Sequence, residues 1–291
     1  MTTETSAALE IAAGAALVGG RAAGAFYGSD DLGIRDKSAG GDAVAGAGTA
    51  EDPVTLADHA ANDAILEFLR ERTAEPVLSE ESRRPDEVSE AERLWIVDPL
   101  DGTKEFIARN GEFSVMVGLA ERGRALLGAV YQPAAGRLYL GDVTRGAWLV
   151  QDPGTTSETR STLRISGSSG QPLRLIRSRS HPDPALADLE SRLAPLEVVI
   201  SGSVGIKCAR IARGEADLYV HPVAFLKEWD TCAPEAVLRG AGGLVTDCLG
   251  GPLRYGKPEP VQPRGIFCGR PDIHERVAPI VQEVARHLIE I

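Results

Sequence analysis

Two aspartates behind a hydrophobic run are the residues best suited to chemistry. Asp98 and Asp101 flank Pro99-Leu100, directly after Trp95-Ile96-Val97, a predicted buried strand, and before a Gly102-Thr103 turn. An unpaired buried carboxylate costs more free energy than one strand contributes, so the pair predicts a nearby cation. Oxygen ligands suit a hard ion such as Mg²⁺, which often shares its coordination shell with a substrate phosphate. The alternative is a capped turn, in which Asp98 ends the strand and Asp101 begins a helix.

Two further acidic elements extend the pattern. Glu80 and Glu81 follow a short predicted strand, residues 76–79, at a spacing from the aspartates that a loop and a return strand can fill. Asp230 is placed to begin a helix, because Pro234 is tolerated only in a first turn and a group of glycines follows the apolar pattern. Taken alone, Asp230 is a helix N-cap. Taken with the other carboxylates, it supplies the last ligand of a multi-metal cage.

Five short motifs follow one another along residues 50–250. They are Pro53-Val54-Thr55-Leu56-Ala57-Asp58, Glu80-Glu81, Asp98-Pro99-Leu100-Asp101-Gly102-Thr103, Ser178-Arg179-Ser180-His181, and Trp229-Asp230-Thr231-Cys232-Ala233-Pro234-Glu235 with Gly242-Gly243 behind it. The set resembles the lithium-sensitive, Mg²⁺-dependent phosphatase superfamily, which includes inositol monophosphatases, fructose-1,6-bisphosphatases and 3'(2'),5'-bisphosphate nucleotidases. Lys104-Glu105-Phe106 is similar to the CysQ-like bisphosphate nucleotidases, whereas inositol monophosphatases usually carry Thr-Asn-Phe there.

The resemblance implies a set of metal ligands. Asp98 would bridge two Mg²⁺ ions, within a total of two or three. Glu80 and the backbone carbonyl of Leu100 would complete one ion, and Asp101 and Asp230 the other. Such ions lower the pKa of an attacking water and neutralise the departing oxygen.

The resemblance also implies catalytic roles for residues around the ligands. Glu80 and the Thr103 hydroxyl would orient the attacking water, and the N–H groups of Gly102 and Thr103 would hold phosphate oxygens. Asp58 forms a capping-box pattern with Thr55 and would bond to a metal-bound water; a helix cap with no further role is the alternative. For Glu81, a solvated charge is favoured over a contact behind the ligands.

The same resemblance implies a set of residues that would contact the substrate. Its members are Gly102, Thr103, Lys104, His181, Ser203 and Lys207. For Lys104 the alternative is an exposed residue of a first helical turn, and for His181 a surface histidine. The chain departs from the common Gly-Ser-Ser-Leu-Lys pattern at Val204 and Gly205, and His221 stands where an arginine is frequent. Neutral imidazole holds phosphate less well than a bidentate arginine, which predicts relaxed specificity.

Three functions remain in competition. The first is a phosphomonoesterase that removes the 3'-phosphate of 3'-phosphoadenosine 5'-phosphate, or of its sulfated form 3'-phosphoadenylyl sulfate, in sulfur assimilation. The second is an inositol or sugar monophosphatase with the same mechanism. The third is a non-catalytic, metal-binding interaction protein, which the intact set of Glu80, Asp98, Asp101, Thr103 and Asp230 disfavours.

The periodicity of apolar residues predicts an α/β fold. Helical spacing over residues 8–26 predicts an amphipathic first helix. Apolar residues alternate over residues 113–119, and strand-like runs separated by turn residues follow up to residue 150, which together predict an antiparallel meander. The polar stretch 152–170 is a seam, after which strands alternate with helices. With the resemblance, we expect a layered α-β-α-β-α sandwich of the inositol monophosphatase type, with an antiparallel-rich N-terminal sheet and a smaller mixed C-terminal sheet.

We expect two domains that share one site. Residues 1–160 would form an α+β domain with most of the metal ligands, and residues 161–291 an α/β domain that supplies Asp230 and the pocket wall. At 291 residues the chain is long enough for such an arrangement.

Composition narrows the partners. The net charge of −11 argues against nucleic acid or an anionic membrane surface, and leaves a small phosphorylated substrate. The apolar stretch 9–18 is too short to span a membrane, and it lacks the positively charged segment that precedes the apolar part of a signal peptide. Four cysteines without a paired spacing predict free thiols and a cytoplasmic location. A homo-oligomer is left open.

Overall fold

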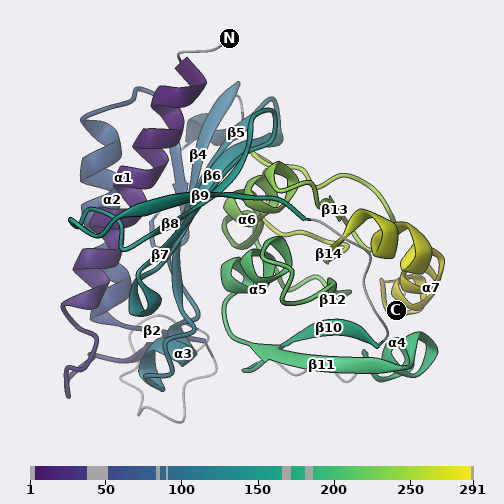
Figure 1. Ribbon diagram of the computed structural model, residues 1–291. Coiled ribbons are helices and arrows are strands. Elements are labelled where there is room, and N and C mark those ends of the chain that lie inside the picture. Colours follow the sequence, from purple (N-terminus) through teal and green to yellow (C-terminus); the bar gives the residue numbers. More distant parts are fainter. Residues whose placement is uncertain are drawn as a thin grey trace.

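Helices and sheets alternate as α-β-α-β-α layers in the structure, a computed structural model that describes residues 4–37, 52–82, 86–89, 91–165, 172–180 and 186–289 (Figure 1). The helices are α1 Glu4–Gly24, α2 Leu56–Arg70, α3 Thr103–Ile107, α4 Leu186–Leu193, α5 Val204–Ala212, α6 Glu228–Gly240 and α7 Pro271–Ile289. The strands are β1 Arg35–Asp36, β2 Pro53–Val54, β3 Val77–Ser79, β4 Arg93–Asp101, β5 Ser114–Glu121, β6 Arg124–Gln132, β7 Arg137–Asp142, β8 Gly146–Gln151, β9 Thr159–Leu163, β10 Leu173–Ser178, β11 Leu196–Ser201, β12 Leu218–His221, β13 Leu244–Thr246 and β14 Ile266–Gly269. The predicted layered fold is confirmed.

The larger sheet has seven strands in the order β3-β4-β5-β6-β7-β8-β9. Strands β3 and β4 pair in parallel, and the neighbours from β4 to β9 pair antiparallel, as the predicted meander requires. Helices α1 and α2 cover its outer face (Figure 1). The buried side of α1 is rich in alanine, including Ala12, Ala15 and Ala16, and these small side chains allow close packing.

The smaller sheet has five strands in the order β11-β10-β12-β14-β13 and is mixed, as predicted. Strands β10, β11 and β12 run parallel, and β12, β14 and β13 pair antiparallel. Helices α5 and α6 fill the space between the two sheets, and α4 and α7 cover the outer face of the smaller one (Figure 1). The apolar core between the sheets therefore contains the helix that carries Asp230.

Helix α6 packs onto the larger sheet over a row of glycines. Gly118 pairs with Gly128, and Gly128 with Gly141, so three neighbouring strands lack side chains at one level. A Cβ atom at Gly141 would lie 2.3 Å from the Cα atom of Val237. The sheet admits helix backbone here, and this close approach sets the position of Asp230 in the first turn of α6.

Helix α6 begins earlier than the sequence predicts. It begins at Glu228, so the prediction that Asp230 starts the helix is wrong, and Pro234 lies inside the helix instead of in its first turn. The Asp230 carboxylate still caps the helix, because it accepts a hydrogen bond from the Lys227 N–H at 2.5 Å. Pro234 lacks the N–H that would bond to the carbonyl of residue 230, so the helix loses one bond near its start and continues.

Strand β9 lies inside the stretch predicted to be a polar seam. It pairs antiparallel with β8, and Leu163 is its one buried residue, so no apolar alternation marks the strand. The chain leaves the larger sheet after Leu163, a few residues beyond the predicted boundary between residues 160 and 161. The division into domains 1–160 and 161–291 stays a prediction.

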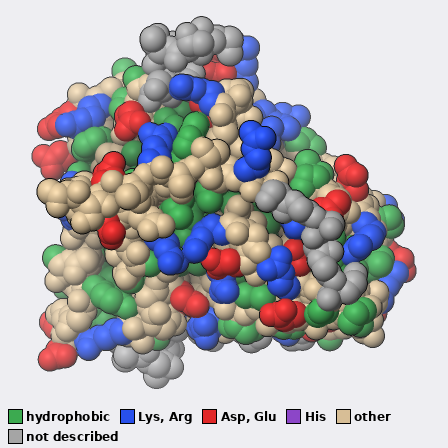
Figure 2. All heavy atoms as spheres, viewed as in Figure 1, with side chains coloured by type: hydrophobic (Ala, Val, Ile, Leu, Met, Phe, Trp, Pro, Cys, Tyr) green, Lys and Arg blue, Asp and Glu red, His purple; other side chains and the backbone are tan. Residues whose placement is uncertain are grey.

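Surface and thiol features complete the fold. On the face shown in Figure 2, acidic, basic and hydrophobic side chains are interspersed. Within the described ranges, no helix has the length and apolar character needed to cross a membrane. The four cysteines are buried free thiols, as predicted.

Candidate active site

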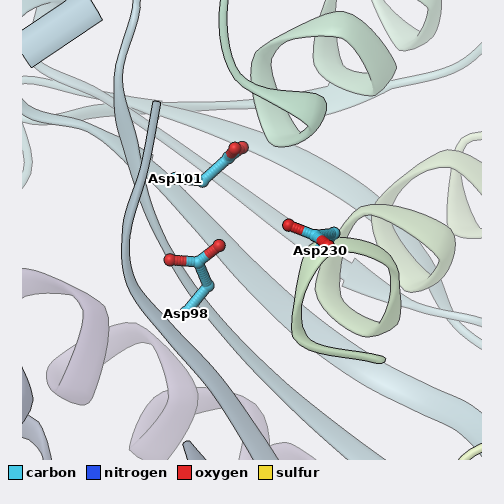
Figure 3. A group of neighbouring side chains, drawn as sticks. All are labelled: Asp98, Asp101 and Asp230. Carbon is cyan, nitrogen blue, oxygen red and sulfur yellow. The ribbon is translucent and has the colours of Figure 1, made fainter. Parts of the chain in front are cut away.

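Three carboxylates from two distant segments meet between the sheets. Asp98 and Asp101 come from the end of β4, and Asp230 comes from α6 on the opposite side (Figure 3). One oxygen atom of each lies within 4.8 Å of those of the other two. Burial raises the pKa of Asp98 and of Asp230, and repulsion by neighbouring carboxylates raises both further. Lys37 and Lys207 offset only part of this negative charge, so the group is suited to hold a metal ion.

A break in the β4 ladder brings the first two carboxylates together. Residues three apart in a regular strand point to opposite faces of a sheet. The register between β4 and β5 shifts between Asp98 and Asp101, where Pro99 cannot donate to the ladder. The Leu100 N–H instead donates to Asp98 Oδ1 at 3.0 Å. The Asp-Pro-Leu-Asp sequence thus converts a strand end into a two-carboxylate corner.

Glu80 lines the same pocket and is paired with a lysine. The Lys37 Nζ atom lies 2.8 Å from Glu80 Oε1 and also bonds to Glu81. Burial lowers the pKa of Lys37, but the two carboxylates outweigh it and raise that pKa overall. Only 6% of the Glu81 side chain is exposed, so the prediction of a solvated charge is wrong. The Lys37 ammonium provides the charge that makes this burial tolerable.

Thr103 and Asp58 form a bonded pair beside the carboxylates. The Thr103 hydroxyl donates to Asp58 Oδ1 at 3.0 Å and lies 3.3 Å from the Leu100 carbonyl. Asp58 Oδ2 accepts bonds from the Thr55 N–H and hydroxyl, at 2.7 and 2.6 Å, so the predicted capping box is confirmed. Burial raises the pKa of Asp58 to about 7, although the Thr55 bonds oppose the change. The helix cap therefore also fixes the direction of the Thr103 hydroxyl.

Gly102 joins the strand end to α3. Its φ is +94°, in the region where a side chain strains the backbone. A Cβ atom there would lie 3.1 Å from the Glu112 carbonyl oxygen. Glycine is required by the turn itself, whether or not a phosphate approaches.

The three carboxylates line a pocket of about 640 Å³. Its other walls include Lys104, Ser203, Lys207, Tyr219, His221 and Phe225. Lys207 is 2% exposed, and its ammonium lies 5.3 Å from the centroid of the Tyr219 ring. Burial lowers the pKa of Lys207, and nearby Asp101 and Glu105 oppose that effect. The pocket therefore combines a group of carboxylates with a buried amine.

The sequence profile of the inositol monophosphatase family matches residues 3–286. The chain belongs to the inositol monophosphatase family. The 3'(2'),5'-bisphosphate nucleotidase CysQ of Salmonella typhimurium is 39% identical over 209 residues, which are 70% of this chain and 80% of that protein. The 3'-phosphoadenosine 5'-phosphate phosphatase of Mycobacterium leprae is 35% identical over 78% of this chain and 81% of its own.

A solved structure of the inositol monophosphatase family agrees with this fold. CysQ from Bacteroides thetaiotaomicron superposes with a TM-score of 0.71 and 32% identity, over 91% of this chain and 97% of that one. The structural likeness therefore extends over most of this chain.

The inositol monophosphatase motifs account for most of the site. The structure brings Asp98, Asp101 and Asp230 into one group and places Glu80, Leu100, Gly102, Thr103, Lys104, Ser203 and Lys207 along the same pocket. Asp58 lies behind Thr103. His181 lies outside the described residues. The ligand and substrate roles of these residues stay predictions.

Two residues that line the pocket were not among the predicted site residues. Phe225 is 54% exposed on the pocket wall, and its ring lies 5.9 Å from that of His221. Glu105 is buried and accepts a hydrogen bond from the Ser180 hydroxyl. Phe225 was visible in the sequence as a lone aromatic residue in a loop, but only the fold shows that this loop borders the pocket.

Proposed function

We propose that this inositol monophosphatase family member is a Mg²⁺-dependent 3'(2'),5'-bisphosphate nucleotidase. It removes the 3'-phosphate of 3'-phosphoadenosine 5'-phosphate and also accepts the sulfated form. One observation carries the proposal: a single pocket is lined by the Asp98, Asp101 and Asp230 carboxylates and also by Lys207 and Phe225. The names of the relatives from Salmonella typhimurium and Mycobacterium leprae support the choice of substrate.

The donor set fits Mg²⁺. Asp98, Asp101, Asp230 and Glu80 offer carboxylate oxygens, and Leu100 offers a carbonyl, which are hard ligands of the kind this ion prefers. The raised pKa values of Asp98 and Asp230 support the fit, because they reflect burial first and repulsion between the neighbouring carboxylates second. When bound, two or three Mg²⁺ ions would neutralise phosphate charge and make a water more acidic.

Thr103 would hold the attacking water. Its one hydroxyl proton is directed at Asp58, so its lone pairs remain to accept a hydrogen bond from a water. Asp58 is buried and bonded to Thr55, so it keeps that orientation without solvent. The pair would thereby position a nucleophile beside the carboxylates.

The wall would bind the remainder of the nucleotide. The Lys207 ammonium is a buried positive charge suited to the 5'-phosphate. The exposed Phe225 ring offers a flat apolar surface of the kind on which a nucleobase stacks. Lys104 and the N–H groups of Gly102 and Thr103 would contact the 3'-phosphate, and His181 and Ser203 would line the nucleoside. This division explains why a bisphosphate with a base suits the pocket better than a bare sugar phosphate.

The identity of the product tests the function directly. Incubation of the purified protein with 3'-phosphoadenosine 5'-phosphate and Mg²⁺ should yield inorganic phosphate and adenosine 5'-phosphate, separated by ion-exchange chromatography. Release of adenosine 3'-phosphate would contradict the proposed orientation. Absence of any phosphate release, with the protein folded by circular dichroism, would overturn the proposed function.

A further inference from the structure

Ser203 holds an unfavourable backbone conformation at the start of α5. Its φ is +46° and its ψ is 130°, a region that favours glycine because a side chain crowds the backbone. The other described non-glycine residues with positive φ are Arg109, Arg122 and Asp152. Ser203 is the member of this group that lines the pocket. Such strain persists only where the surroundings impose it.

Every hydrogen-bonding position of the Ser203 hydroxyl is used. Its oxygen lies 2.5 Å from Asp101 Oδ2, 2.9 Å from Ser114 Oγ and 3.0 Å from the Ile206 nitrogen. A carboxylate only accepts, so Ser203 donates to Asp101. The Ile206 amide only donates, and the Ser114 hydroxyl then donates as well. One proton and two lone pairs are engaged, which fixes the direction of the hydroxyl.

Asp101 takes its orientation from this arrangement. The Gly205 N–H also donates to Asp101 Oδ2, at 3.0 Å, so two donors hold the same oxygen. Asp101 Oδ1 accepts no hydrogen bond from any residue in the described part of the chain, which leaves it for a cation. Both Ser203 and Ser114 are buried, at 4% and 0% exposed, so water does not compete for these bonds.

The bond also joins the two halves of the molecule. Asp101 ends β4 in the larger sheet, whereas Ser203 precedes α5, which follows a strand of the smaller sheet. The strained residue thus connects the position of α5 to the direction of a carboxylate in the three-carboxylate group.

We infer that Ser203 is a positioning residue for the cation site, which keeps a strained backbone so that its hydroxyl orients Asp101. Folding stability is thereby traded for cation affinity. The inference rests on the proposed cation site, with Asp101 as one of its ligands.

The substitution Ser203→Gly separates the two quantities. It removes the hydroxyl and relieves the strain, so in EDTA the Tm should equal that of the wild type or rise by about 2–4 °C. Affinity for Mg²⁺, measured by calorimetry with no substrate present, should fall by about tenfold or more, because the carboxylate loses a partner that orients it. Mn²⁺, followed by electron paramagnetic resonance, gives a second readout of the same site.

Two companion variants complete the test. Ser203→Ala also removes the hydroxyl but keeps the backbone strain. It should weaken Mg²⁺ binding as much as Ser203→Gly does, while its Tm falls below that of the wild type. Ser201→Ala is the matched control: it is a buried serine two residues earlier, whose Oγ has no hydrogen-bond partner within the described residues. Its ion affinity should match the wild type.

The outcomes separate the inference from the proposed function. Equal weakening of ion binding in Ser203→Gly and Ser203→Ala, whatever their Tm, supports the positioning role. Wild-type affinity in Ser203→Gly, or weakening only in the variant whose Tm falls, overturns it while the cation site stands. A wild-type protein that binds neither Mg²⁺ nor Mn²⁺ overturns the cation site and this inference together.

Discussion

At the scale of single residues, Asp98 is a buried carboxylate whose close neighbours include other carboxylates. Asp98→Asn keeps the shape of the side chain and removes its charge. Phosphate release should fall by about 100-fold or more, because loss of an orienting partner alone costs 10–100-fold and this change removes a proposed ligand. The Tm in EDTA should not fall, since a repelling charge has been removed. Turnover near the wild-type level would show that Asp98 is not a ligand.

The same variant gives a prediction about metal binding. Mg²⁺ should raise the Tm of the wild type, because an ion that binds only the folded state stabilises it by mass action. In Asp98→Asn this rise should be lost, and differential scanning fluorimetry with and without MgCl₂ measures it. An equal rise in both proteins would place the ion elsewhere.

Phe225 separates recognition of the base from the chemistry. Phe225→Ala should weaken binding of adenosine 5'-phosphate by about tenfold, since stacking on an aromatic ring contributes roughly 1–3 kcal/mol per base. Binding of ribose 5-phosphate should not change, and Phe225→Tyr should bind adenosine 5'-phosphate as the wild type does. Leu56→Ala, at a residue 44% exposed and outside the pocket lining, is the control. Calorimetry that shows equal losses for both ligands would contradict a stacking role.

At the scale of elements, the glycine row under α6 determines where Asp230 lies. A Cβ atom at Gly128 would lie 2.5 Å from the Cα atom of Ala233, and neither backbone can yield locally. Gly128→Ala should therefore cost about 1–3 kcal/mol in the free energy of unfolding and also weaken Mg²⁺ binding, because α6 must move away from β4. Gly24→Ala is the control, since a Cβ atom there meets nothing within 4 Å. A variant destabilised with unchanged Mg²⁺ affinity would show that α6 does not set the site.

A second element-scale contact joins the loop after α3 to the ends of β10 and β11. Glu112 accepts bonds from Arg179 Nε at 2.7 Å and from the Gly202 N–H at 2.7 Å. Burial would raise the pKa of Glu112, but these bonds outweigh it and lower that pKa below 4.5. A carboxylate with a lowered pKa stabilises the fold above its unfolded pKa and loses this contribution as the pH falls through its folded pKa.

The expected consequence is a pH-dependent effect of Glu112→Gln. At pH 7 the variant should lose about 1 kcal/mol, or about 2–4 °C in Tm, because the pair is partly exposed. As the pH falls below about 4.5 the difference from wild type should shrink, since the wild-type carboxyl becomes protonated too. Thermal melts from pH 7 to pH 3 measure it. A difference that stays constant or grows at low pH would contradict the assigned bonds.

At the scale of the whole molecule, patterns that are local in sequence were predicted and contacts between distant segments were not. The strand-and-turn pattern over residues 113–150 predicted the meander, and the capping-box pattern of Thr55 and Asp58 predicted the start of a helix. The Asp-Pro-Leu-Asp run predicted a pair of neighbouring carboxylates, because the break in the strand depends on four adjacent residues. Only the family resemblance predicted that Asp230 lies beside the carboxylates of β4, because no local sequence pattern connects the two segments.

The misses have physical causes. Strand β9 has one buried residue, so no periodicity marked it. The burial of Glu81 depends on Lys37, a partner far away in sequence. Pro234 inside α6 breaks a general rule, because the helix is also held by its packing on the glycine row. Each miss involves tertiary packing that overrides a local preference.

The most direct measurement is the ratio of kcat/KM for 3'-phosphoadenosine 5'-phosphate to that for inositol 1-phosphate, at one Mg²⁺ concentration, with EDTA and lithium controls. The account predicts a ratio far above one, with both activities lost in EDTA and reduced by lithium, because the proposed contacts of Lys207 and Phe225 are to parts that only the nucleotide has. A ratio near or below one would contradict the nucleotidase assignment and favour an inositol or sugar monophosphatase. Activity that persists in EDTA would contradict the role of the three carboxylates as metal ligands.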